Sequence, residues 1–173
     1  MSKPALKKHL LSLTREQLVE TILEMYDNIK PAKEYLEYFL NPNEEEMLKK
    51  YKAVIQKEFA SEWKYAEPKL RFSVARKAIA EFKALKPAPE KLADLMLMLP
   101  EKACEFTYNY GDMTEQFYNS AHTNFKTALA FIHKHKLLDD FKLRCDNCVQ
   151  WASVCGYGFA DEIADVFYEY YPS

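Results

Sequence analysis

Residues 92–100 read LADLMLMLP, which is the densest apolar run in the chain. The run is much shorter than the roughly 18 apolar residues that a membrane span needs, and Pro100 ends it. We therefore interpret it as part of a buried helix in a soluble protein. That helix should begin near Pro89 and run towards Tyr108, and Pro100 should break or kink it at about Leu99.

Helical periodicity continues on both sides of this run, and no segment shows the sustained apolar–polar alternation of a half-buried strand. Glycine is scarce at three residues, whereas a β-rich domain needs glycine at many turns. Caps, prolines and apolar stripes together predict nine helices. These helices are expected near residues 5–11, 15–29, 31–40, 44–59, 68–85, 89–108, 115–135, 138–154 and 159–170.

The sequence thus predicts an all-α fold. Short connections make neighbouring helices antiparallel, so we expect helical hairpins stacked into a compact α-α superhelix, with an irregular helical bundle as the alternative. The 173 residues fit one domain, residues 1–173, because no linker is long enough to divide the chain.

Composition restricts the classes of function. The formal net charge is −2, with 24 basic and 26 acidic residues, which argues against a dedicated nucleic-acid binder. The first residues lack the apolar run of a signal peptide, and four cysteines without such a signal indicate reduced thiols. We therefore expect a cytoplasmic protein that does not associate with membranes.

The thiols Cys145 and Cys148 form a CxxC pair, a spacing typical of metal and redox sites. A zinc site needs further ligands, and a thioredoxin-like motif needs a βαβ setting; the sequence offers neither. Steps of four and three residues instead predict one buried helical stripe, made of Phe141, Cys145, Cys148, Ala152 and Cys155. We expect no metal or cofactor, and a metal site at these thiols is the weakest of three hypotheses.

Basic and aromatic residues support the leading hypothesis, a non-catalytic module that binds a protein or peptide. Lys69, Arg76 and Lys83 recur every seven residues along the predicted fifth helix and would supply electrostatic contacts. Tyr108 and Tyr110 lie in an aromatic-rich segment and would serve as apolar anchors. The structural alternatives are a solvated basic face, attracted to the acidic last helix, and aromatic packing at helix junctions.

A second hypothesis is an enzyme or small-ligand binder with a site near Tyr110, Asp112, Asn119 and His122. No local motif supports it, because the chain has no HExxH, no paired Glu-x-x-His and no glycine-rich phosphate loop. The sequence thus leans away from an enzyme and identifies neither a reaction nor the oligomeric state.

Several segments of the chain are distinctive. They are LTREQL at residues 13–18, YFLNPNEE at 38–45, PKLRFSVA at 68–75, and Phe159 with YEYY at 168–171. Together they resemble a family of uncharacterised bacterial proteins, a domain of unknown function found mainly in Bacteroidetes. The resemblance covers most of the chain. It implies a small helical bacterial protein and assigns no catalytic residue.

Overall fold

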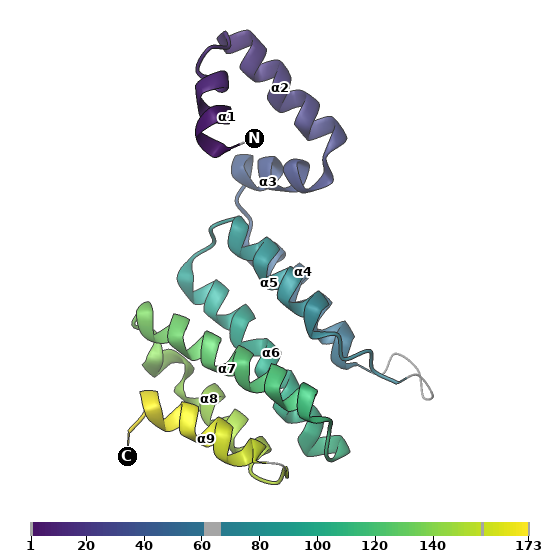
Figure 1. The fold of residues 1–173 in the computed structure, drawn as a ribbon, viewed down its shortest axis with the longest axis vertical. Coiled ribbons are helices and arrows are strands. Elements are labelled where there is room, and N and C mark those ends of the chain that lie inside the picture. Colours follow the sequence, from purple (N-terminus) through teal and green to yellow (C-terminus); the bar gives the residue numbers. More distant parts are fainter. Residues whose placement is uncertain (1, 61–66, 157, 173) are drawn as a thin grey trace. The chain divides into compact units, whose positions relative to one another are not determined.

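A computed structural model describes residues 2–60, 67–156 and 158–172. Helix is the only regular secondary structure in these ranges, which confirms the predicted all-α fold (Figure 1). The helices are α1 Lys3–Leu10, α2 Arg15–Asn28, α3 Lys30–Leu40, α4 Glu44–Phe59, α5 Phe72–Ala84, α6 Pro89–Tyr110, α7 Glu115–Lys134, α8 Leu138–Ala152 and α9 Phe159–Tyr170.

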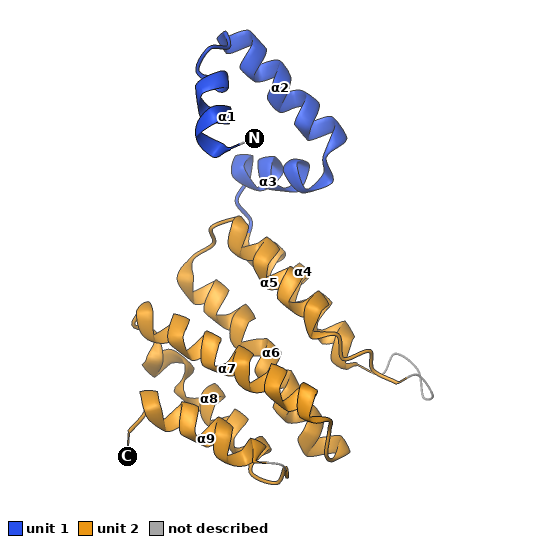
Figure 2. Ribbon diagram, viewed as in Figure 1, with its two compact units in different colours: residues 1–43 blue, residues 44–173 orange. Residues whose placement is uncertain are grey.

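The chain divides into two compact units, residues 1–43 and 44–173 (Figure 2). Unit 1 contains α1 to α3, and unit 2 contains α4 to α9. The single domain stays a prediction, as does the stacking of hairpins into a superhelix.

Side-chain caps define the starts of α2 and α7, as the sequence predicts. At α2, Thr14 Oγ1 accepts a hydrogen bond from the Gln17 backbone N–H at 3.2 Å, while Gln17 Oε1 accepts the Thr14 N–H at 2.9 Å. This reciprocal pair is a capping box. At α7, Thr114 Oγ1 accepts the Phe117 N–H at 3.3 Å. Each cap satisfies amide groups that the helix itself leaves without partners.

Helix α6 forms the centre of unit 2, where it packs against α4, α5, α7 and α8. Leu95, Leu97 and Leu99 have no exposed surface, and Pro100 is almost completely buried. The proline lacks the N–H that would bond one turn back, yet the helix continues through it to Tyr110. Packing around this stretch holds the helix where the hydrogen bond is missing, so Pro100 does not break it.

An ion network joins α6 to α4 and α8. Arg144 donates from Nε to Glu101 Oε1 at 2.7 Å and from Nη1 to Asp94 Oδ1 at 2.6 Å. Lys52 Nζ lies 2.5 Å from the other oxygen of Asp94. Burial alone would lower the pKa of Arg144, but its bonds to the two carboxylates raise that pKa. The guanidinium therefore stays charged and links the three helices.

The predicted cysteine stripe is confirmed for four of its five residues. Phe141, Cys145, Cys148 and Ala152 are buried in α8, whereas Cys155 lies beyond the end of the helix and is half-buried, so its inclusion in the buried stripe was wrong. Burial raises the pKa of Cys145 to about 12 and also raises the pKa of Cys148. These thiols act as small apolar groups of the core.

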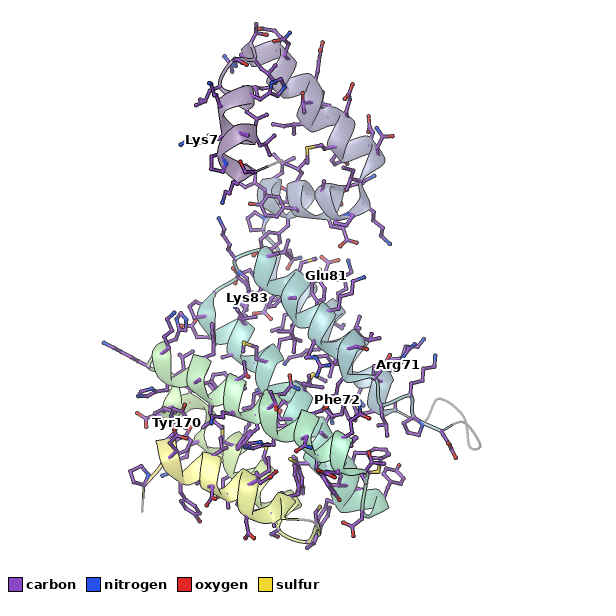
Figure 3. The ribbon with its side chains drawn as sticks, in the orientation of Figure 1. Lys7, Arg71, Phe72, Glu81, Lys83 and Tyr170 are labelled. Carbon is purple, nitrogen blue, oxygen red and sulfur yellow. The ribbon has the colours of Figure 1, made fainter. Side chains whose placement is uncertain are left out.

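Helix α5 begins at Phe72, so the prediction that Pro68 opens it is wrong. Arg71, the residue just before α5, is held by Glu58, whose carboxylate accepts hydrogen bonds from Arg71 Nε at 2.9 Å and Nη2 at 2.8 Å. Figure 3 shows Arg71 and Phe72 together at this end of α5. The Leu70 N–H donates to the Glu58 carbonyl at 2.9 Å.

Leu70 also has a φ of +50°, a value outside the range of right-handed helices. Lys69 therefore lies before α5 and does not share a helical face with Arg76 and Lys83, contrary to the prediction from their spacing.

Within the described ranges, every helix falls short of the length or the apolar character that crossing a lipid bilayer requires.

We expect Cys155 to react first with a thiol reagent, because Cys104, Cys145 and Cys148 are buried. The three buried thiols should react only as fast as the protein opens. Mass spectrometry of peptides from native protein labelled at about pH 8, near the ordinary thiol pKa, would follow each cysteine over time. Labelling of Cys145 or Cys148 as fast as that of Cys155 would contradict the buried stripe.

Replacing Glu58 by Gln should lower the free energy of unfolding by about 1 kcal/mol at neutral pH. The Arg71 hydrogen bonds hold the pKa of Glu58 below its ordinary 4.5. A lowered carboxyl pKa stabilises the folded state above the unfolded value, and this stabilisation is lost as the pH falls through the folded pKa. The difference between Glu58→Gln and wild type in urea denaturation should therefore shrink as the pH falls below about 4.5. A difference independent of pH would argue against this role for the ion pair.

Candidate functional site

Three neighbouring hollows surround the first half of α7 in unit 2. They measure about 400, 420 and 620 Å³, are open to solvent and share lining residues, so we describe them together as one furrow. We call it the α7 furrow and define it by the residues that line it. They are Leu70, Phe72, Ser73, Arg76, Asp112, Met113, Thr114, Glu115, Gln116, Phe117, Tyr118, Asn119, Ser120, Thr123 and Glu162.

Aromatic side chains form part of the floor of the α7 furrow. Phe72 at the start of α5 meets Phe117 of α7 edge to face, with ring centroids 5.1 Å apart. Both rings are largely buried, at 7% and 6% exposure. Edge-to-face packing fixes the orientation of both rings, so the floor is preformed and apolar.

Polar side chains on α7 line the rim of the furrow. Gln116, Asn119 and Ser120 recur at helical spacing on one side of α7, and the first two are exposed. Within the described chain, the side chains of Gln116 and Asn119 have no hydrogen-bond partner. Their amides can therefore donate and accept hydrogen bonds to a ligand.

Charge is distributed unevenly along the furrow. Arg76 is the one basic side chain among the described lining residues, and it forms no ion pair within the described ranges. The hollow nearest α9 instead carries the exposed carboxylates Glu115 and Glu162. One end of the furrow is therefore cationic and the other is anionic.

A hydrogen-bonded junction closes the anionic end. The Gly156 N–H and the Tyr118 hydroxyl both donate to Asp112 Oδ1, at 3.0 and 2.9 Å. The Met113 N–H donates to the Tyr118 oxygen at 3.0 Å. The bond from Gly156, and to a smaller extent the bond from Tyr118, lowers the pKa of Asp112. Burial raises the pKa of Tyr118 to about 12.

This junction ties the turn after α6 to the turn after α8. A Cβ added at Gly156 would lie 3.4 Å from Asp112 Oδ2, so the carboxylate already occupies the space beside this glycine. Asp112 is thus a structural acceptor as well as a lining residue.

The structure brings together three of the eight residues proposed from the sequence, namely Arg76, Asp112 and Asn119. The other five lie outside the α7 furrow. Lys69 precedes α5 and Lys83 lies in the last turn of α5 (Figure 3). Tyr108 and Tyr110 are exposed near the end of α6, where Tyr110 stacks on Phe106 with centroids 4.6 Å apart, and His122 is half-buried on α7.

The floor and most of the polar rim were not predicted from the sequence. A usable signal was present in residues 114–124, TEQFYNSAHTN, where short polar side chains follow the Thr114 cap. Their helical spacing marks a polar face, but only the fold shows that this face borders α5 and α9.

The ionisable side chains of the furrow are few. Its described lining contains no histidine, cysteine or lysine, and its charged side chains are Arg76, Asp112, Glu115 and Glu162. Among the described residues, no three side chains of His, Cys, Asp or Glu are gathered where they could hold a metal ion.

Replacing Tyr118 by Phe should lower the free energy of unfolding by about 1 kcal/mol, because the hydroxyl bonds two partners in a largely buried position. Urea denaturation followed by circular dichroism would measure the change. Tyr108→Phe is the matched control, because Tyr108 is 52% exposed and should tolerate the loss. Equal stability of Tyr118→Phe and wild type would show that the junction does not hold the turns together.

Comparison with known proteins identifies the family of this chain. No curated protein and no solved structure matches it. A model of a family of unknown function, DUF6155, matches residues 1–163 and thus most of the chain. The protein is therefore a member of the uncharacterised DUF6155 family.

Proposed function

We propose that this protein is a non-catalytic interaction protein whose α7 furrow binds an extended peptide segment of a partner. The observation that carries the proposal is the row of uncommitted amides, Gln116 and Asn119, beside a preformed aromatic floor. An extended peptide presents backbone donors and acceptors to such a row while an apolar side chain contacts the floor.

The charges of the furrow favour one class of peptide. Arg76 can pair with an Asp, a Glu or a terminal carboxylate, and its planar guanidinium suits two-point hydrogen bonding. Glu115 and Glu162 would repel an acid at the other end. The preferred segment therefore has an apolar residue beside an acidic one, with neutral or basic residues towards α9.

The small-ligand alternative has less support from the geometry. Tyr110 and His122 lie outside the furrow, and the Asp112 carboxylate already accepts two hydrogen bonds.

We also propose a bacterial cytoplasm as the location, supported by the family resemblance. The four cysteines are free thiols, as in a reducing compartment.

Selection from a random peptide display library tests the proposed function. Wild-type protein should enrich peptides that carry an acidic residue beside an apolar one. Arg76→Glu should weaken binding of the enriched peptides by about tenfold or more, because it replaces a charge-assisted hydrogen bond by repulsion. Titration of labelled peptides, followed by fluorescence anisotropy, would measure the change.

Lys83→Glu is the matched control, because it reverses an exposed charge on the same helix outside the furrow. Ser120→Trp should also reduce binding by filling the furrow, without changing its charge. If the same peptides bind Arg76→Glu and Ser120→Trp as tightly as wild type, the furrow is not the binding site.

A further inference from the structure

Unit 1 fully buries none of its described apolar side chains, although several are half-buried. No described side chain in residues 2–43 is buried within this unit. Helix α2 packs against α3, whereas α1 has few close backbone contacts with any other helix. The large apolar side chains that α1 and α2 leave exposed are Leu6, Val19, Ile22, Leu23 and Met25.

Short helices in water need the burial of an apolar face to stay ordered, because intrinsic propensity alone is marginal at these lengths. A unit of about 40 residues rarely supplies a sufficient core by itself and usually needs a staple, a metal or a partner. Several large apolar side chains exposed on one small unit are typical of an interaction site. Unit 1 is therefore expected to be covered by another surface.

The charges of unit 1 are separated between its helices. Helix α1 carries Lys3, Lys7 and Lys8 and no acidic residue. Helix α2 carries four acidic residues, Glu16, Glu20, Glu24 and Asp27, and one basic residue, Arg15. Within the described residues, the three lysines and the three glutamates form no ion pair, and Lys7 projects outward from α1 (Figure 3).

Each charged row lies beside an apolar row on the same helix. On α1, Lys3 and Lys7 flank the pair formed by Leu6 and Leu10. On α2, Glu20 and Glu24 flank the pair formed by Val19 and Leu23. One helix thus presents apolar and basic rows, and the other presents apolar and acidic rows.

We propose that a second copy of this chain covers unit 1, with α1 of each copy packed against α2 of the other. A two-fold axis makes both contacts equivalent, so each basic row meets an acidic row while the apolar rows are buried between them. This homodimer uses a surface separate from the α7 furrow, and it does not depend on the proposed function.

The charges of unit 1 disfavour a membrane as the covering surface. Residues 2–43 contain six basic and six acidic residues, so the unit has no net positive charge to bind anionic lipid. An anionic membrane would attract the basic row of α1 but repel the acidic row of α2. A partner that carries both rows in complementary order is most simply the same chain.

Analytical ultracentrifugation of the full chain tests the proposal. Wild-type protein should sediment with twice the mass of the 20.3 kDa chain. The basic-row variant carries Lys3→Glu and Lys7→Glu, together with Lys8→Glu outside the row. It should associate at least about tenfold more weakly, since each change counts twice across a two-fold axis. The acidic-row variant, Glu16→Lys with Glu20→Lys and Glu24→Lys, should be weakened similarly.

Mixing the two variants should restore a dimer, because α1 of each then faces an oppositely charged α2 in the other. A control with Lys49→Glu, Lys126→Glu and Lys134→Glu makes the same change in net charge on exposed residues of unit 2 and should dimerise like wild type. Circular dichroism should show equal helix content in wild type, the unit 2 control and the mixture, whereas each row variant alone should lose helix, because its unit 1 is left without a covering partner.

A wild-type monomer at all concentrations would overturn the proposal. If that monomer bound vesicles containing phosphatidylserine, the exposed apolar side chains of unit 1 would belong to a membrane-binding surface instead. A dimer that survives in both row variants, or a mixture of the two that stays monomeric, would also overturn it.

Discussion

Burial of the middle of α6 is the constraint on which the rest of unit 2 depends. Its leucines at positions 95, 97 and 99 have no exposed surface, and each such side chain contributes about 1.5 to 3 kcal/mol relative to exposure. Four helices cover it, and the Arg144 network fixes two of them through charged groups that stay paired. The α7 furrow exists because α7, held on α6, borders the start of α5 and the start of α9.

The two units of the chain differ in how much of their apolar surface they bury. Unit 2 buries its stripes within itself, including the cysteine stripe of α8. Unit 1 has the same helical periodicity in sequence, but none of its described side chains is buried within it. Helical pattern therefore does not by itself imply a core, because a core also requires enough helices around a common centre. In the proposed dimer, the second copy would bury the apolar side chains of unit 1, as α6 buries those of the helices around it in unit 2.

Elements governed by local chemistry were predictable, and elements governed by distant contacts were not. Caps such as Thr14 and Thr114 lie within three residues of their partners, so their helices begin where the sequence predicts. Glu58 contacts Arg71 across 13 residues, and α5 begins at Phe72, directly after this contact, rather than at the predicted Pro68. The furrow escaped prediction for the same reason, since its walls come from three helices and only α7 shows a polar face.

Helix α6 is thus the stable centre of unit 2, whereas unit 1 lacks a core of its own. Hydrogen–deuterium exchange of the full chain, read by mass spectrometry, tests this most directly. Amides of α6 should exchange last, through global unfolding, while those of α1 to α3 should exchange through smaller openings, slowed at protein concentrations that favour the dimer. Exchange of α6 as fast as α1 would contradict the account.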